Sequence, residues 1–156
     1  MPLLVRALRS AGHRVWFANL MKRIAPPLDR LLHRLTGGRV HVADLLVPTL
    51  MLEHVGRRSG QRYRTPLLYV SVRGGGWAVA GTNFGQTHHP AWVLNLSANP
   101  DAQVVVRGRT VSVRARPATS EERETIWPDL VRAWPAMNTY LGRAGRDIPI
   151  YVLEPR

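Results

Sequence analysis

From residue 49 onward, apolar positions recur with the short period of β-strands. Runs rich in β-branched and aromatic residues, bounded by turn residues, predict six strands, over 49–55, 63–72, 77–82, 103–107, 110–116 and 148–153. The glycine run at 74–76 predicts a tight connection between the second and third strands, and Gly108 predicts a hairpin between the fourth and fifth. Short strands of mainly antiparallel type with a few helices predict an α+β domain built around a barrel.

Two stretches between these strands have helical signals. A proline suited to a first turn opens a predicted helix over 90–98. Thr119 followed by Glu122 has the spacing of a capping box, which predicts a second helix start. Pro128 and Pro135 lack the backbone donor that a helix needs, and we expect them to break the rest into short pieces.

Residues 1–40 form a distinct basic segment whose apolar residues recur at roughly helical spacing. Basic residues beside aromatic ones would suit a peripheral anchor on an anionic membrane, and the favoured alternative is a helix packed on the barrel or on a partner subunit. We expect one globular unit, with segment 1–40 joined to a barrel domain over 41–156. Charges interrupt the apolar run too often for a signal peptide or a spanning helix, so a cytoplasmic location is the default expectation.

The charge of the chain points to anionic partners. Among 156 residues there are 22 Lys and Arg against 10 Asp and Glu, which gives a net charge of +12, and Lys22 is the only lysine. Guanidinium forks suit phosphate and carboxylate, so a phosphorylated cofactor, a nucleic acid or an anionic lipid would fit. An arginine-rich composition is also typical of GC-rich genomes, and no nucleic-acid motif is present.

The absence of cysteine excludes disulfides and thiolate chemistry.

A glycine-bounded basic turn at 56–60 lies between the first two predicted strands. It contains Arg57, Arg58 and Ser59, and more arginines follow in the second strand. Glycines free the backbone while guanidiniums and a hydroxyl supply donors, a combination suited to phosphate. The alternative is an ordinary basic surface hairpin.

A second candidate region runs from the small residues at 81–85 to the predicted helix start. Small residues let a planar ligand approach the backbone, and a helix N-terminus offers amide donors, although such loops also occur without a ligand. His88 and His89 are adjacent and lack a third ligand at useful spacing, which disfavours a metal site. Trp92 fits a core position, whereas Asn95 needs a polar partner if it is buried.

Trp134, Met137 and Tyr140 share one helix face at a spacing of three. They either pack in the core or cover a pocket for a flat substrate, where the Tyr140 phenol suits a carbonyl or nitro oxygen. The chain lacks a catalytic carboxylate pair, a nucleophile elbow, a Walker loop and a dinucleotide fingerprint. If it is an enzyme, we expect a cofactor to supply the chemistry.

Five blocks in order, at 56–61, 65–70, 89–100, 121–128 and 148–150, closely resemble the deazaflavin-dependent nitroreductase family of split β-barrel oxidoreductases. The resemblance runs from about residue 48 to the C-terminus. It implies coenzyme F420, an 8-hydroxy-5-deazaflavin with a phosphodiester and an anionic polyglutamate tail. By this resemblance, the cofactor-binding residues are Arg57, Arg58, Ser59, Gln61, Arg64, Thr65, Pro66, Leu67, Ala80, Gly81, Thr82, Asn83, Phe84, His89, Pro90, Ala91, Trp92 and Asn95.

The resemblance also implies hydride transfer from reduced F420 to a small acceptor, with Tyr140 and Trp134 as the residues beside the reaction. The corresponding helix of the family's nitroreductase is rich in tyrosine, so quinones or enones are the expected acceptors ahead of nitro compounds. Arg62 and Arg64 flank the position where relatives have one arginine, which leaves open which of them reaches the phosphate. A homodimer is expected by the same resemblance, and the alternative function is a split-barrel protein that binds a flavin-like or hydrophobic ligand without turnover.

Overall fold

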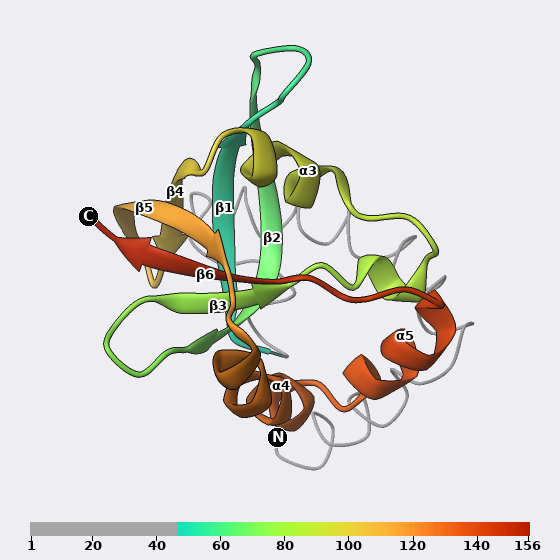
Figure 1. The fold of residues 1–156 in the computed structure, drawn as a ribbon. Helices are drawn as coiled ribbons and strands as arrows, with labels where there is room; N and C mark the ends of the chain where they lie inside the picture. Colours follow the sequence, from blue (N-terminus) through green and yellow to red (C-terminus); the bar gives the residue numbers. More distant parts are fainter. Residues whose placement is uncertain (1–46) are drawn as a thin grey trace, which may run out of the picture.

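The computed structural model describes residues 47–156, which form a closed six-stranded barrel with helices packed around it (Figure 1). Neighbouring strands are all antiparallel, in the order β1-β2-β3-β6-β5-β4. The strands are β1 (Thr49–Val55), β2 (Arg62–Ser71), β3 (Trp77–Ala80), β4 (Asp101–Val106), β5 (Arg109–Pro117) and β6 (Ile150–Pro155). This architecture confirms the predicted α+β barrel, and the predicted strand ends differ from the observed ones by no more than two residues.

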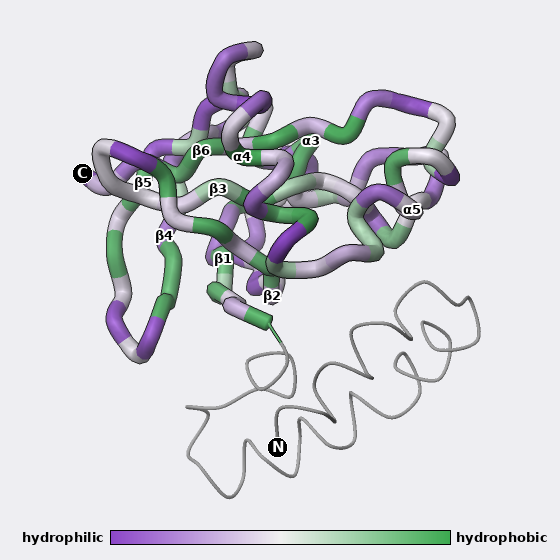
Figure 2. The backbone as a smooth tube through the Cα atoms, turned by 90° about the horizontal axis from the view of Figure 1, so that it is seen from below, coloured by the Kyte–Doolittle hydropathy of each residue, from purple (hydrophilic) through white to green (hydrophobic). Residues whose placement is uncertain are grey.

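Successive side chains on a strand point to opposite faces of the sheet, and the buried residues form two clusters, one on each face. Leu52, Val104 and Leu153 point into the barrel, where Trp92 and Leu96 of α3 (Ala91–Ala98) close the packing. Figure 2 shows hydrophobic stretches along β4 and β5, joined by a hydrophilic turn. Helix α3 therefore belongs to the barrel core, and its position is fixed by the apolar area that it buries.

The second cluster lies between the outer face of β3 and β6 and the two C-terminal helices, α4 (Ser120–Ala133) and α5 (Ala136–Ala144). The predicted capping box is present at the start of α4. The Glu122 N–H donates to Thr119 Oγ1 over 3.2 Å, and the Thr119 N–H donates to Glu122 Oε2 over 2.9 Å. Both interactions satisfy backbone donors that the first helical turn leaves without partners.

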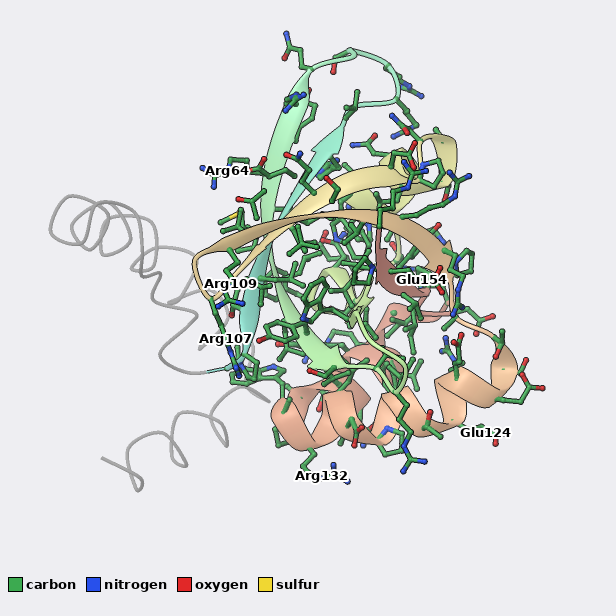
Figure 3. The ribbon with its side chains drawn as sticks, turned by 90° about the vertical axis from the view of Figure 1, so that its left-hand side faces the viewer. Arg64, Arg107, Arg109, Glu124, Arg132 and Glu154 are labelled. Carbon is green, nitrogen blue, oxygen red and sulfur yellow. The ribbon has the colours of Figure 1, made fainter. Side chains whose placement is uncertain are left out.

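The prediction that Pro128 breaks this helix is wrong, because α4 continues through it to Ala133. Buried Ile126 and Leu130 lie on either side of the proline and hold both halves against the barrel, which outweighs one missing backbone hydrogen bond. Figure 3 shows Glu124 and Arg132 on the opposite face of α4, pointing away from the barrel. Pro135 does separate the two helices, as the sequence predicts.

The basic segment over 1–40, with its expected membrane or barrel contact, lies outside the described residues. Among residues 47–156, no helix has the length and apolar character needed to cross a bilayer.

Candidate functional site

A cavity of about 690 Å³ lies between the β1–β2 hairpin, the loop before α3 and α3 itself. This volume is within the usual range for small-molecule and cofactor sites. In Figure 1 the β1–β2 hairpin projects from the barrel and α3 lies beside its base. The cavity brings together eleven of the predicted cofactor-binding residues, namely Arg57, Arg58, Ser59, Arg64, Thr65, Asn83, His89, Pro90, Ala91, Trp92 and Asn95.

The turn at 56–60 is held by its own backbone. The Gly56 N–H donates to the Gln61 carbonyl over 2.8 Å, and the Gly60 N–H donates to the Gly56 carbonyl over 2.9 Å. Gly56 cannot be larger, because a Cβ there would lie 2.6 Å from a ring carbon of Tyr63. The Tyr63 hydroxyl in turn lies 3.1 Å from Ser59 Oγ. The turn is thus folded over the Tyr63 ring in one defined shape.

Arginines around the turn differ in what their side chains contact. Arg64 is paired with Glu53, its cross-strand neighbour, at 3.0 Å. Arg57 and Arg58 are exposed, and within residues 47–156 neither forms an ion pair. Arg62 is exposed and is not among the residues that line the cavity. Two guanidiniums at the mouth of the cavity are therefore available to an anion.

Asn95 has the polar partners that the sequence requires of it. It is only 5% exposed, and its Oδ1 accepts from the Arg57 backbone N–H over 3.1 Å. Its Nδ2 lies 3.2 Å from His54 Nδ1, and His54 Nε2 lies 3.1 Å from Thr65 Oγ1. A continuous polar chain therefore joins α3, β1 and β2 under the turn.

His54 is a site residue that sequence reasoning missed. It is 4% exposed, and burial lowers the pKa of its imidazole below the ordinary value of 6.5. The available signal was the alternation of β1, which places His54 on the inward face with Leu50 and Leu52. The cavity also contains Gly56, Tyr63, His88 and Leu94, which the predicted residue set does not include.

Arg146, two residues after the end of α5, fixes the loop that forms the opposite wall. Its guanidinium donates to the carbonyls of Gly81, Thr82 and Gln86 over 3.1, 3.3 and 3.1 Å. It also donates to His89 Nδ1 over 3.0 Å. Because a guanidinium has no acceptor, Nδ1 must be the unprotonated nitrogen, and a neutral His89 carries its proton on Nε2. His89 lines the cavity, so this N–H is a candidate donor to a ligand there.

Several predicted cofactor contacts lie outside the cavity lining. Gly81 is buried, and its missing side chain is explained by packing, since a Cβ would lie 2.7 Å from Val93 Cγ2. Phe84 has a positive φ of 55° and is 52% exposed, with its ring edge-on to Tyr140 at 6.2 Å. The other predicted contacts outside the lining are Gln61, Pro66, Leu67, Ala80 and Thr82. Their part in binding stays a prediction.

Trp134 and Tyr140 lie in the second core cluster and do not line the cavity. Tyr140 is 6% exposed, and the Trp134 indole donates to its hydroxyl over 3.3 Å. Trp134 is the capping residue that follows α4, so it does not share a helix with Tyr140 as the spacing of three predicts. The proposed contact of these two residues with a substrate stays a prediction.

Comparison with known proteins assigns the chain to a family. Residues 29–155 match the family model described as F420H(2)-dependent quinone reductase. The chain belongs to this family. Membership confirms the family relationship inferred from the sequence, and with it an enzyme that depends on F420H2.

The names of individual relatives agree with the description of the family. A Mycobacterium tuberculosis protein, named as a candidate F420H(2)-dependent quinone reductase, is 39% identical over 110 residues, covering 70% of this chain and 92% of its own length. A second protein of that species, named F420H(2)-dependent quinone reductase, is 30% identical over 138 residues, covering 83% of this chain and 89% of its own length.

Solved structures extend the comparison to the fold. An F420-H2 dependent reductase has a TM-score of 0.63 at 30% identity, covering 69% of this chain and 94% of that one. A domain-swapped dimer has a TM-score of 0.66 at 30% identity, covering 86% of this chain and 98% of that one. Haem storage protein HutZ from Vibrio cholerae, at 17% identity and a TM-score of 0.53 over 70% of this chain and 82% of its own, shares the fold alone.

Proposed function

We propose that this chain binds coenzyme F420 in the cavity beside α3 and reduces quinones with it. The observation that carries the proposal is the turn at 56–60, which presents at the cavity mouth the guanidiniums of Arg57 and Arg58, neither of them in an ion pair with another described residue. Charge-assisted hydrogen bonds from guanidinium to phosphate are among the strongest polar contacts that a protein surface makes. An anionic phosphodiester arm matches this turn in charge and in donor count.

The other lining residues fit a planar, polar ring system. Trp92, Pro90 and Ala91 give an apolar side to the cavity, while Thr65 and His89 offer donors. When bound, F420H2 supplies the hydride that reduces the acceptor. The chain itself holds the anionic arm at the turn, provides the wall fixed by Arg146 and orients donors toward the ring.

Quinones are the acceptors in the family's description, and we propose enones and nitro compounds as additional ones. Tyr140 and Trp134 are proposed to contact the acceptor near the exposed ring of Phe84, which lies edge-on to Tyr140. The chain is further proposed to form a homodimer, because a structure similar to it is a domain-swapped dimer. Peripheral membrane contact through residues 1–40 is a separate proposal, and binding of the full chain to anionic vesicles tests it.

The test of function has two stages. Purified protein is titrated into oxidised F420 and binding is followed by quenching of cofactor fluorescence. F420H2 and menadione are then mixed with the protein without oxygen, and the return of oxidised F420 absorbance is measured, with NADPH as the control reductant. Quinone-dependent oxidation of F420H2 but not of NADPH is the expected result.

Two outcomes contradict the proposal in different ways. Failure to bind F420 at micromolar protein would remove the proposed cofactor. Tight binding without transfer to any quinone would instead favour the alternative function, a split-barrel protein that holds a flavin-like ligand without turnover.

A further inference from the structure

The polar chain under the turn has only one consistent arrangement of protons. A backbone N–H can only donate, so the Asn95 atom that faces Arg57 must be the amide oxygen. The Asn95 NH2 group then faces His54 Nδ1, which must accept. Hence the proton of neutral His54 lies on Nε2 and is donated to Thr65 Oγ1.

This arrangement excludes His54 as a proton shuttle toward the cavity. If Nε2 gave up its proton through Thr65, only Nδ1 could be reprotonated, and Nδ1 faces an amide NH2 that has no proton to release. The imidazole would be left as an anion in a buried site, which is strongly unfavourable. The role of His54 must therefore lie in what it holds in place.

His54 contacts both supports of the turn. Through Nδ1 it fixes the orientation of the Asn95 amide, whose oxygen holds the Arg57 backbone. Its ring also stacks on Tyr63, with centroids 5.9 Å apart and planes at 24°, and the turn is folded over Tyr63. The buried His54 side chain thus contacts both the Asn95 amide and the Tyr63 ring, the two groups that define the shape of the turn at 56–60.

We propose that His54 is a positioning residue for the turn at 56–60, and that protonation of His54 releases Arg57 and weakens cofactor binding. A proton on Nδ1 would place two donors face to face. Reversal of the Asn95 amide would relieve that contact, but it would turn NH2 toward the Arg57 N–H and break the bond to the turn. The part of this inference that concerns cofactor affinity rests on the proposed function.

The pH range follows from the surroundings of His54. Burial lowers the pKa of His54, so the neutral form predominates at neutral pH and affinity is lost on the acid side. From β2 it faces the Tyr63 phenol and the Thr65 hydroxyl, and from α3 the uncharged Asn95. The charged or titratable groups that share its cavity or lie beside it are Arg57, Arg58, Arg64 with its partner Glu53, His88 and His89.

A first experiment needs no cofactor. In 15N- and 13C-labelled full-length protein, the His54 ring signals and the Arg57 amide signal are followed between about pH 8 and about pH 5, the range in which histidines change charge. The inference expects the Arg57 amide to shift with the same midpoint as the His54 ring. An Arg57 amide that stays unchanged while His54 titrates would overturn it.

A matched pair of variants separates the two hydrogen bonds of His54. His54→Asn places an amide oxygen at the position of Nδ1 and can still accept from Asn95. His54→Gln places its amide at the position of Nε2 and can hydrogen-bond only to Thr65. Neither side chain titrates, and both lose the ring stack on Tyr63. Because the stack is lost in both, the comparison is between the two variants: we expect His54→Gln to bind F420 about tenfold more weakly than His54→Asn, the cost of about one hydrogen bond.

The pH dependence of F420 affinity provides a second test of the role of His54. Wild-type affinity for F420 is expected to fall toward acid pH, and His54→Asn is expected to lose that fall because its side chain does not titrate. His88 and His89 remain in both proteins, so a difference between the two reports on His54. Equal affinity of the two variants, or an unchanged acid dependence in His54→Asn, would overturn the inference. Should wild-type protein not bind F420 at all, the proposed function fails, while the shared midpoint of His54 and Arg57 still decides whether His54 controls the turn.

Discussion

Replacement of both turn arginines tests the electrostatic basis of the proposed function. In the Arg57→Gln/Arg58→Gln variant, each side chain keeps a polar end but loses its charge. The Arg57 backbone N–H, which donates to Asn95, is unaffected, so the turn keeps its support. The change therefore acts on the guanidiniums themselves.

The expected magnitude follows from the exposure of these side chains. A hydrogen bond to a charged group contributes about 1.5 kcal/mol at the lower end of its range, so two such bonds give about 3 kcal/mol. Both arginines are exposed, and salt at physiological strength screens charges beyond about 8 Å. Allowing for loss of about half to screening, the dissociation constant for F420 should rise between about tenfold and about 100-fold.

The assay is fluorescence quenching of oxidised F420 at low and at physiological salt. Arg107→Gln/Arg109→Gln is the matched control, because it removes the same charge from the β4–β5 turn. That turn lies at the other end of β1, where Met51 pairs with Val105, and Figure 3 shows both arginines far from the β1–β2 hairpin. The control should bind F420 with nearly wild-type affinity.

Two results would refute the reasoning. If both double variants lost affinity equally, overall charge rather than the turn would attract the cofactor. If neither lost affinity, the guanidiniums of the turn would have no part in binding.

Three further predictions concern the helices. Tyr140→Phe should lower kcat/KM for quinones with an unchanged dissociation constant for F420, and unchanged kinetics would limit Tyr140 to core packing. Thr119→Ala removes the α4 cap and should cost about 1 kcal/mol, lowering the melting temperature by about 2 to 4 °C; no change would show that the cap is dispensable. Hydrogen bonds from Arg116, and then from the Thr119 N–H, lower the pKa of Glu122 to about 2 from 4.5. The stability that ionised Glu122 contributes is therefore present above about pH 4.5 and is lost as pH falls toward 2. Glu122→Gln should flatten this acid-side loss in urea unfolding, and an equally steep loss would contradict the assignment.

Local signals predicted most of the fold because they act over a few residues. The capping box at Thr119 needs only the spacing to Glu122, and strand periods of two follow from the pleat. Pro128 shows where such signals fail: the missing backbone donor is a local penalty, but the packing of Ile126 and Leu130 against the barrel outweighs it. That packing depends on residues far away in sequence.

The candidate site could be predicted only where a local signal marks it. The turn at 56–60 contains its own chemistry and could be recognised, and Asn95 could be assigned a need for partners. His54 was missed because its partners come from α3 and β2, although its inward position follows from the alternation of β1. The contacts of Arg146 with three backbone carbonyls of the 81–86 loop have no sequence signature at all, since any residue provides a carbonyl.

Those contacts of Arg146 bear on how the enzyme can evolve. Because the guanidinium donates to main-chain oxygens, exposed side chains of this loop such as Thr87 and His88 can be exchanged while these contacts stay in place. Gly85 must be kept, because its φ is +77° and a Cβ there would lie 3.1 Å from Tyr140 Cα. Directed evolution of acceptor preference could therefore randomise the exposed positions at little structural risk, provided that Arg146 and Gly85 are left in place.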